Sequence, residues 1–289
     1  EISVAGDEDW YSFSGTAGQA VMFELLGDTS LDGSTLTIYD SEGGIVGQNF
    51  YTNETYDDAA LGFAVATTGT YYIAVSDGAG TTGGYTLSAT TYLPDAFEAT
   101  PQELADYLTD GYWEDTGRTR HSFDTTSSNQ ITVNITALTA DGQQLARWAF
   151  EAWEMVADVE FVEVAGAADI TFDDIYSGAY ASYNATGTTT TDAFVNISTD
   201  WLATYGTTLD SYSFNTYVHE IGHALGLGHQ SNYNGSARYG VDEDFLNDSW
   251  LMSIMSYFSA YENTYVIGDG RYPDNFLGGA MMADILAIQ

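Results

Sequence analysis

The sequence predicts a multidomain protein, in which an N-terminal antiparallel β-sandwich is followed by a domain of the α+β or α/β class. Three observations predict this division. Residues 1–91 consist of short apolar runs with alternating polarity, separated by Gly, Asp, Ser and Thr. Residues 92–101 contain two of the chain's three prolines, which is typical of a linker. Beyond them the apolar residues change to helical spacing. We therefore expect domains at residues 1–91 and 101–289, with a linker at residues 92–100.

Four segments of the first part have the alternation of half-buried strands. They are residues 20–26, 34–39, 70–76 and 84–89. Apolar residues alternate at Leu36 and Ile38 in one segment, and at Tyr71, Ile73 and Val75 in another. Turn residues recur about every eight to twelve residues, as in antiparallel sandwiches. No segment of helical period interrupts them, so this whole part is expected to be β-structure.

The second part begins with a helix signal. Thr100-Pro101-Gln102-Glu103 is a capping box with proline at the first helical position. We expect a short helix that reaches about Thr109 before Gly111 ends it. A core helix is expected at residues 142–156, whose apolar residues recur at helical spacing. Strands are expected at residues 131–135, 160–164, 170–172 and 193–197.

The charge balance is extremely acidic. The chain has 42 Asp and Glu against five basic residues, all of them arginine, which gives a net charge of −37. Such a field repels phosphate backbones and anionic lipids, so we expect no nucleic-acid partner and no membrane partner. It favours solubility in a saline medium, binding of cations such as calcium, or both. Because cysteine is absent, the chain has no disulfide, no thiolate nucleophile and no thiolate metal ligand.

One segment carries the residues of a metal site, namely His219, Glu220, His223, Gly226 and His229. On an α-helix, residues four apart lie on one face, so His219 and His223 can present ring nitrogens to the same metal ion. A sharp turn at Gly226, with a positive φ, would bring His229 to that ion. Three neutral nitrogens leave a fourth position open for water, which is how catalytic zinc differs from structural zinc.

Glu220 directly follows the first ligand, so its carboxylate is expected to reach the water and not the ion. Zinc lowers the pKa of its water to about 7. Glu220 would then take the proton as the water attacks a peptide carbonyl, and would return it to the leaving amine. Ordinary core or surface histidines are one alternative, but three of the chain's four histidines fall in this pattern. A structural zinc site is the other, and it leaves the glutamate unexplained.

The pattern H-E-x-x-H-x-x-G-x-x-H resembles that of the metzincin metalloproteases, and Ser253-Ile254-Met255-Ser256-Tyr257 resembles their methionine turn. This resemblance implies an α+β catalytic domain with a mixed sheet and a long zinc-binding helix. It implies that Met255 supports the histidines without binding zinc. It also implies that the Tyr257 hydroxyl can approach the zinc as an additional ligand and can hydrogen-bond the developing oxyanion. A core methionine and a core tyrosine are the alternative.

Residues 104–113 and 282–289 are similar to the serralysins within this group. Astacins commonly rely on disulfides and matrixins usually hold latency through a cysteine, and this chain has no cysteine. Gln230 departs from the serralysin pattern, which often has proline after the third histidine; this bears on the subfamily and not on zinc binding. Serralysins also usually continue into calcium-binding glycine-rich repeats where this sequence ends at Gln289. The secretion route is therefore left open.

The first part resembles the bacterial pre-peptidase C-terminal domain in the order of residues 6–13, 36–40 and 69–75. Such domains usually accompany secreted proteases as accessory modules, and some members bind calcium. The resemblance thus implies calcium as a second cofactor, with Asp7 and Asp9 as candidate ligands. The alternative is that these are solvated loop acids beside a buried Trp10.

Metzincins generally bind an extended peptide against an edge strand, and residues 177–181 are the candidate for that strand. The candidate substrate-binding residues are Gly178, Ala179, Tyr180 and Ala181. An ordinary loop is the alternative. His121 has no partner at a ligand spacing, so it is expected to be structural.

The sequence therefore predicts a secreted zinc-dependent endopeptidase that hydrolyses protein or peptide bonds by Glu-assisted attack of a zinc-bound water. The chain begins at Glu1 without a basic-then-apolar leader, and we expect a processed part of a larger secreted precursor. The main alternative is a zinc-containing surface or polymer binding protein whose protease activity is latent or lost. A second alternative makes the N-terminal domain an inhibitory partner that covers the cleft, so that residues 101–289 alone would be more active than the full chain.

Overall fold

The computed structural model describes residues 1–27, 34–49, 58–77, 80–92, 98–259, 262–263, 265–266 and 278–289. The chain forms two compact units. The first consists of Glu1–Glu98, Tyr233–Ser249 and Tyr257–Pro273, and the second of Ala99–Asn232, Trp250–Ser256 and Asp274–Gln289. This grouping joins two late segments of the chain to its N-terminal part. The predicted domains are continuous stretches of the sequence, and their limits stay a prediction.

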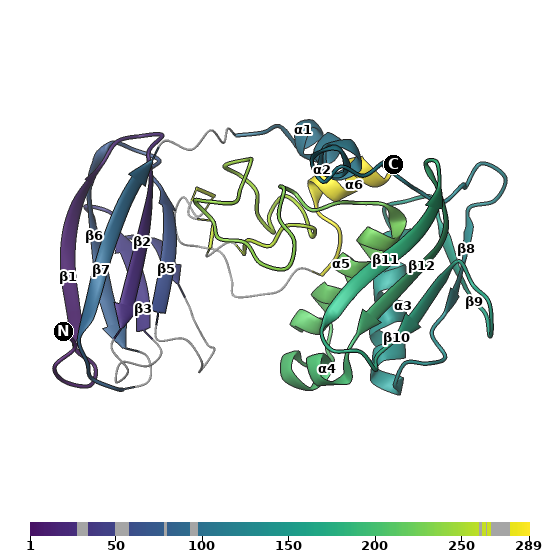
Figure 1. The fold of residues 1–289 in the computed structure, drawn as a ribbon, viewed down its shortest axis with the longest axis horizontal. Coiled ribbons are helices and arrows are strands. Elements are labelled where there is room, and N and C mark those ends of the chain that lie inside the picture. Colours follow the sequence, from purple (N-terminus) through teal and green to yellow (C-terminus); the bar gives the residue numbers. More distant parts are fainter. Residues whose placement is uncertain are drawn as a thin grey trace. The chain divides into compact units, whose positions relative to one another are not determined.

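The N-terminal part of the first unit consists of two antiparallel sheets (Figure 1). The four-stranded sheet has the order β1-β6-β3-β4 and the three-stranded sheet the order β5-β2-β7. The strands are β1 (Glu8–Gly15), β2 (Ala20–Gly27), β3 (Ser34–Tyr39), β4 (Ile45–Asn49), β5 (Asp58–Ala64), β6 (Gly69–Asp77) and β7 (Tyr85–Tyr92). Every pair of neighbours is antiparallel. The four segments expected to be strands fall on β2, β3, β6 and β7.

The two sheets enclose one apolar core. Leu36 and Ile38 of β3 and Ile73 of β6 are buried in it, at the alternating positions read from the sequence. Phe13 of β1 packs inward as well, with its ring centroid 4.9 Å from that of Phe23 in β2. Residues of both sheets therefore share this core.

Trp10 lies on the opposite side of β1. Its side chain is 50% exposed, and its ring centroid lies 4.7 Å from that of Tyr39. Trp10 and Phe13 occupy alternate faces of the strand, so only one of them can face the core. The expectation of a buried Trp10 is therefore wrong, and Asp9 belongs to the strand, whereas Asp7 lies just before it.

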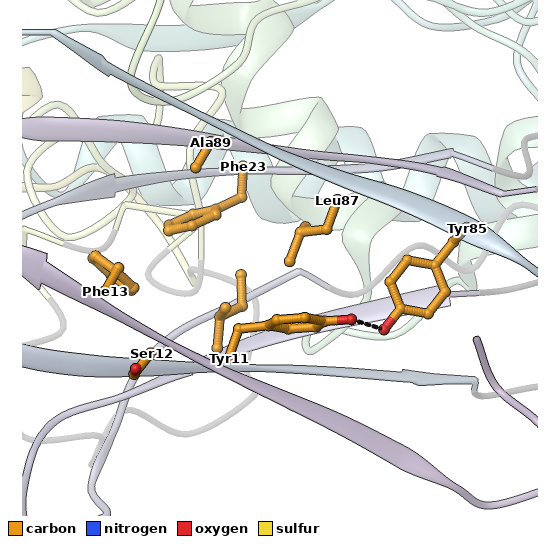
Figure 2. Close-up of a pocket in the computed structure, with 8 residues that line it drawn as sticks. Tyr11, Ser12, Phe13, Phe23, Tyr85, Leu87 and Ala89 are labelled. Atoms are coloured by element: carbon orange, nitrogen blue, oxygen red, sulfur yellow. Dashed lines mark hydrogen bonds between the residues drawn. The ribbon is translucent and has the colours of Figure 1, made fainter.

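A cavity of about 220 Å³ lies between the two sheets. Figure 2 shows its lining, in which Phe13 and Phe23 are apolar and the hydroxyls of Tyr11 and Tyr85 meet at 2.7 Å. Tyr85 also hydrogen-bonds Asp9 Oδ2 at 2.6 Å. This hydrogen bond lowers the pKa of the Asp9 carboxyl.

The second unit is built on a mixed five-stranded sheet with the order β11-β12-β10-β8-β9 (Figure 1). The strands are β8 (Gln130–Asn134), β9 (Glu160–Glu163), β10 (Ile170–Asp173), β11 (Ala179–Thr186) and β12 (Thr189–Ile197). The pairs β9–β8, β8–β10 and β10–β12 are parallel, whereas β11 is antiparallel to β12. In this sheet β11 is an edge strand, with one side of its backbone unpaired by β-structure.

Two helices, α3 (Ala140–Glu154) and α5 (Tyr212–Leu225), pack against each other, and α5 also contacts β11 and β12. Trp153 of α3 is fully buried and donates a hydrogen bond from Nε1 to the Val218 carbonyl of α5 at 3.0 Å. The shorter helices α4 (Thr199–Tyr205) and α6 (Met282–Ile288) belong to the same unit. Within the part of the chain that the structure describes, no helix combines the length and apolarity needed to cross a membrane.

The first helix of this unit begins at the predicted capping box. The Glu103 carboxylate accepts a hydrogen bond from Thr100 N at 2.8 Å, and the Thr100 side chain accepts one from Glu103 N. α1 (Pro101–Asp106) continues through a π-helical turn (Tyr107–Gly111) into α2 (Tyr112–Asp115). The predicted helix end at Gly111 is wrong, because Gly111 keeps a helical φ of −57°. A Cβ there would lie 2.5 Å from the Tyr107 ring, so the glycine makes room for that ring.

Candidate metal centre

Helix α5 carries the first two histidines of the motif. Its N-cap, Ser211, accepts a hydrogen bond from Phe214 N at 3.2 Å, and its C-cap is Gly226. Between these caps His219 and His223 are one helical turn apart and lie on the same face. Their ring centroids are 4.7 Å apart and their planes are perpendicular.

The turn at Gly226 redirects the chain from α5 toward His229. Gly226 has a left-handed φ of 112°, and a Cβ there would lie 2.0 Å from the His121 carbonyl oxygen. Glycine is therefore required both by the backbone angle and by the space available. The Gly226 carbonyl accepts a hydrogen bond from Trp113 Nε1 at 3.0 Å, which fixes the turn from outside the helix.

His121 lies behind this turn. Its Nδ1 is 2.9 Å from Thr190 Oγ1, and its ring stacks on Tyr183 with centroids 3.4 Å apart. Burial lowers the pKa of His121 to about 4, so the ring is neutral at neutral pH. It packs and positions the turn, as expected for a structural residue.

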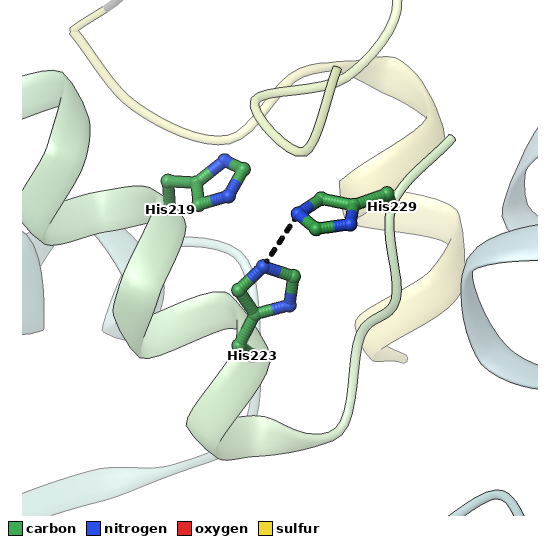
Figure 3. A group of neighbouring side chains, drawn as sticks. All are labelled: His219, His223 and His229. Atoms are coloured by element: carbon green, nitrogen blue, oxygen red, sulfur yellow. Dashed lines mark hydrogen bonds between the residues drawn. The ribbon is translucent and has the colours of Figure 1, made fainter. Parts of the chain in front are cut away.

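The three histidines of the motif come together, as Figure 3 shows. One nitrogen from each lies within 4.8 Å of the others, and the Nε2 atoms of His223 and His229 are 3.0 Å apart. The outer nitrogens bond to carbonyl oxygens, His219 Nδ1 to Ile254 at 2.9 Å and His223 Nδ1 to Leu227 at 2.8 Å. A carbonyl only accepts, so each of these Nδ1 atoms donates a proton. Nε2 is then the unprotonated nitrogen of the His219 and His223 rings, and an unprotonated nitrogen is what a metal ion requires.

The histidine cluster fits a zinc ion. Burial lowers the pKa of His219 to about 4 and that of His223 to about 3, so both rings are in the neutral form that binds metals. Tetrahedral zinc with nitrogen at about 2.0–2.1 Å requires ligand nitrogens about 3.3 Å apart. The Nε2 atoms of His223 and His229, 3.0 Å apart, are close to this separation, and all three nitrogens lie within 4.8 Å of one another. Small movements of the rings would complete three ligand positions and leave the fourth open.

Glu220 lies beside the cluster on α5, and its side chain is 7% exposed. Burial raises the pKa of its carboxyl to about 8, and a hydrogen bond with the Ala181 backbone of β11 partly opposes this. A bound divalent cation would lower that pKa again, because it stabilises the carboxylate. Glu220 thus follows the first histidine on α5 and contacts the backbone of β11.

The methionine turn packs directly beneath α5. Met255 is fully buried, and a Cβ added at Gly222 would lie 2.6 Å from Met255 Sδ. The same position would lie 3.1 Å from the Trp153 ring. Gly222, the residue before His223, is therefore the point at which the sulfur approaches the helix backbone. This packing of Met255 against the helix does not need Met255 to bind a metal.

Asp284 of α6 anchors the methionine turn and was not among the predicted site residues. Its carboxylate accepts hydrogen bonds from Ser253 Oγ at 2.6 Å, from Ile254 N at 2.7 Å and from Met281 N at 2.7 Å. It is fully buried, and burial raises its pKa to about 6. The sequence signal for this residue was an aspartate within the otherwise apolar segment 282–288.

Two family models match the chain. One described as matrixin matches residues 123–239, and one described as the bacterial pre-peptidase C-terminal domain matches residues 7–77. Residues 123–239 are therefore similar to matrixins. The matrixin match includes the three histidines and Glu220. The pre-peptidase match covers β1 to β6.

The chain is also similar to curated serralysins over half of its length. Identity is 33% to serralysin B of Dickeya chrysanthemi, over 50% of this chain and 32% of that protein. It is 30% to serralysin of Proteus mirabilis, over 50% and 33%. The chain thus spans about a third of the length of these relatives. A solved hatching enzyme zinc-protease of Oryzias latipes matches with a TM-score of 0.35 and 20% identity, over 58% of this chain and 92% of that one. That TM-score is below the level at which two folds correspond.

The candidate substrate residues lie at the start of β11, within the residues that match the matrixin model. Ala179, Tyr180 and Ala181 belong to this edge strand, and Tyr180 is 39% exposed. Gly178 precedes the strand in a left-handed turn with φ 82°. Its carbonyl accepts hydrogen bonds from Ser198 N at 3.0 Å and Asn196 Nδ2 at 3.1 Å, which fixes the strand's first residue.

Tyr257 belongs to the first compact unit, although it follows Met255 by two residues. Its hydroxyl accepts a hydrogen bond from Gly235 N at 3.2 Å, and its ring centroid lies 4.7 Å from that of Tyr233. Its assignment as a zinc ligand or catalytic group stays a prediction.

The carboxylates expected to bind calcium have protein partners. Asp7 accepts hydrogen bonds from Ser3 Oγ at 3.2 Å and Glu8 N at 3.1 Å, and Asp9 accepts one from Tyr85. Among the described residues, the three histidines are the group of His, Cys, Asp and Glu side chains close enough to hold a metal. Calcium at Asp7 and Asp9 stays a prediction.

Proposed function

We propose that this chain is a zinc-dependent endopeptidase. The observation that carries the proposal is the meeting of three metal-facing histidine nitrogens within 4.8 Å, next to a buried glutamate that touches an edge strand. The matrixin and serralysin similarities support the same activity for the part of the chain that they cover.

In this proposal His219, His223 and His229 hold the zinc ion. When bound, zinc would lower the pKa of a water molecule and polarise the carbonyl of the scissile peptide bond. The Glu220 carboxylate accepts the proton of the attacking water and passes it to the nitrogen of the leaving amine. Gly226 supplies the turn that the third ligand requires, and Met255 supports the helix beneath the ligands.

We assign to Tyr257 the role of hydrogen-bonding the oxyanion that develops on the carbonyl oxygen, with zinc ligation at rest as a further possibility for its hydroxyl. Tyrosine suits this task because its hydroxyl can donate to an oxyanion without carrying charge.

The substrate in this proposal is an extended protein or peptide segment that adds to the free edge of β11. Gly178, Ala179, Tyr180 and Ala181 would present backbone groups to it. Such pairing tolerates many side chains, so broad cleavage preference is expected. The hydrogen bond between Glu220 and Ala181 would place the base at the strand that holds the scissile bond.

Further parts of the proposal concern the whole chain. We propose that residues 1–91 form an accessory β-sandwich, residues 92–100 a linker and residues 101–289 the catalytic domain. We also propose that the protein is secreted, that it binds calcium in addition to zinc, and that it has neither a nucleic-acid nor a membrane partner. The acidic composition supports the exclusion of anionic partners.

A zinc-containing binding protein with lost activity is the second candidate. The aromatic-lined cavity of about 220 Å³ between the N-terminal sheets favours it, because such a cavity can accept a small apolar group. An intact Glu220 beside three intact ligands favours the peptidase.

The test measures metal content by elemental analysis and digestion of casein, before and after a zinc chelator. We expect about one zinc ion per chain, with digestion lost on chelation and restored by zinc. Glu220→Ala should keep zinc and lose digestion, whereas Glu151→Ala, an exposed glutamate of α3, should keep both. Bound zinc without digestion in the wild type would support the binding protein, and absence of zinc would overturn the proposal.

A further inference from the structure

The cavity of about 220 Å³ in the first unit lies between the edge strands of its two sheets. β1 is an edge strand of the four-stranded sheet, and β7 is an edge strand of the three-stranded sheet. Both strands line the cavity, together with one residue each from β2 and β6. All of these residues belong to the first compact unit, so the cavity does not involve the metal centre.

The cavity opens to solvent between β1 and β7. Tyr85, Leu87 and Ala89 alternate along β7 and line the cavity, so they face the inside of the sandwich. Nevertheless Leu87 is only partly buried and Ala89 is exposed. Tyr11, which lines the cavity from β1, is 43% exposed. Inward-facing residues that water still reaches mark the mouth of the cavity, and a small molecule can enter there without separating the sheets.

The neighbouring part of the core is tightly packed. At Gly15, two residues after Phe13 on β1, a Cβ would lie 2.8 Å from the Val65 side chain and 3.2 Å from the Tyr71 ring. The Phe13 ring stacks on Tyr71 with centroids 5.5 Å apart. Protein interiors leave few voids larger than a water molecule. The cavity is therefore a local feature of this core, and the small side chain of Ala89 leaves part of it unfilled.

One end of the cavity is polar and the other is apolar. Figure 2 shows the hydroxyls of Tyr11 and Tyr85 at one end and the rings of Phe13 and Phe23 toward the other. Tyr85 donates its one hydroxyl proton to Asp9 Oδ2 at 2.6 Å. In the 2.7 Å contact between the two hydroxyls, Tyr11 is therefore the donor. The Tyr11 oxygen still accepts hydrogen bonds, so the polar end offers an acceptor to a ligand.

The size and the lining of the cavity fit one aromatic ring. An apolar cavity of about 150 Å³ in another protein binds benzene, so about 220 Å³ holds such a ring with a small substituent. The rings of Phe13, Phe23 and Tyr11 can contact it edge to face. The Asp9 carboxylate, directly behind the hydroxyl pair, disfavours a negatively charged substituent.

We infer that this cavity is a binding site for a small aromatic group that carries a hydrogen-bond donor, of which a phenol is the simplest example. The ring lies between the two sheets and its hydroxyl donates to Tyr11 Oη. The phenol is either a free molecule or the side chain of a tyrosine in another polypeptide. This inference goes beyond the proposed peptidase activity, because the site requires neither zinc nor Glu220.

The test titrates the full-length, zinc-loaded protein with para-cresol and with toluene, which has the same ring and methyl group without the donor. The methyl resonances of Ile73 and Leu87, which line the cavity, report binding. We expect a Kd of about 0.1 to 1 mM for para-cresol, as for a ligand of this size. Toluene should bind about three- to tenfold more weakly, because it cannot hydrogen-bond Tyr11.

A third probe distinguishes the two sources of the phenol. N-acetyltyrosinamide carries the same ring on a peptide backbone. If it shifts the same resonances as para-cresol, the site accepts a tyrosine side chain of a polypeptide. If para-cresol alone shifts them, the site is one for free phenols.

Filling the cavity tests its location. Ala89→Leu places a larger apolar side chain in the space, so para-cresol should bind at least about tenfold more weakly, while the melting temperature stays equal or rises. Thr90→Leu is the matched control, because Thr90 is the next residue of β7, points to the opposite face and is exposed. It should bind para-cresol with the wild-type Kd.

Tyr11→Phe keeps the inference testable if Ala89→Leu does not fold. This variant retains the ring and removes the acceptor oxygen. Its Kd for para-cresol should rise to about that for toluene, by about three- to tenfold, and its Kd for toluene should not change. Equal changes for both ligands would contradict the hydrogen bond to Tyr11.

The remaining outcomes also decide the matter. Para-cresol that leaves the Ile73 and Leu87 resonances unshifted, or that binds equally well to Ala89→Leu, would overturn the site. An equal Kd for para-cresol and toluene in the wild type would overturn the selection of a donor. Glu220→Ala should bind para-cresol like the wild type, so a failure of the peptidase and a failure of this site are observed separately.

Discussion

At the scale of single residues, the metal-binding histidines depend on what their second nitrogen contacts. His219 Nδ1 donates to the Ile254 carbonyl and His223 Nδ1 to the Leu227 carbonyl. These hydrogen bonds select the tautomer that points Nε2 toward the centre. The acceptor carbonyls lie in the methionine turn and just after Gly226. Ligand geometry is thus set by backbone atoms outside the helix that carries the ligands.

His121 leads to a prediction about acid stability. Its pKa is about 4 in the folded protein, below the usual value of 6.5. The unfolded chain therefore binds more protons between these two pH values, and folding is stabilised fully above pH 6.5 and less as the pH falls toward 4. A shift of this size corresponds to about 3 kcal/mol.

His121→Phe keeps an aromatic ring against Tyr183 but cannot be protonated. The wild type should lose about 2 to 3 kcal/mol more than this variant between pH 7 and pH 4.5, measured by urea unfolding without metal. The other buried histidines contribute equally to both proteins and cancel. Parallel pH profiles for the two proteins would mean that His121 does not titrate in this range.

At the scale of elements, the metal centre depends on the end of one helix, α5, and on the start of another, α6. Helix α5 ends in the Gly226 turn, and α6 holds the methionine turn through Asp284. Neither contact involves a metal ligand directly. Each nevertheless decides the position of one, His229 in the first case and His219, through Ile254, in the second.

Gly226→Ala should destabilise the fold by about 3 kcal/mol or more and weaken zinc binding, because the new Cβ collides with the His121 carbonyl. Gly187→Ala is the control. That residue has a φ of 64° but open space around its Cβ position, so it should lose only about 1 kcal/mol. Urea unfolding and zinc titration measure both effects. Equal losses in the two variants would show that the backbone angle alone matters.

Asp284→Ala should cost about 3 kcal/mol, since it removes the acceptor of three hydrogen-bond donors. It should also weaken zinc binding by about tenfold, because the methionine turn that orients His219 is released. Asp141→Ala, at an exposed position in the first turn of α3, should lose no more than about 1 kcal/mol. Unchanged zinc affinity in Asp284→Ala would show that the methionine turn does not orient His219.

Sequence patterns predicted those elements whose determinants are local. The alternation at β3 and β6, the capping box at Thr100 and the helical spacing of His219 and His223 can each be read within a few residues. β5 was not predicted, because Gly62 and Ala64 occupy the positions where an exposed strand would carry polar residues. Small apolar residues occur there because Tyr233, Tyr239 and Phe258, which lie far along the chain, pack against this side of the strand.

The supporting residues of the site were harder to predict than its ligands. The three histidines and Glu220 occur in one short pattern whose chemistry is specific. Trp113 and Asp284 act through contacts with Gly226 and with the methionine turn, far from them in sequence. No period or spacing connects such positions with their partners, so the sequence can mark Asp284 as unusual in an apolar helix but does not show what it contacts.

At the scale of the whole molecule, charge is the dominant property. A net charge of −37 implies strong self-repulsion in the compact state at low ionic strength. We predict that the midpoint of thermal unfolding rises by several degrees as NaCl increases from about 0.01 to 0.5 M, because the Debye length shortens from about 30 Å to a few ångströms.

Calcium chloride at matched ionic strength separates screening from specific binding. The same rise in both salts would mean screening alone, whereas a larger rise in calcium that disappears in Asp7→Asn/Asp9→Asn would assign the additional stabilisation to those carboxylates. A melting temperature that does not change with NaCl would contradict the self-repulsion argument.

The exchange of segments between the two units has a consequence for synthesis. During translation the strands of both N-terminal sheets emerge early, and they can pair with each other at once. The residues that cover Ala64 emerge only after helix α5. A nascent chain therefore leaves Ala64 of β5 uncovered for as long as the ribosome takes to read the intervening residues, so the first unit, although its strands are made first, cannot be completed until helix α5 of the second unit has been made.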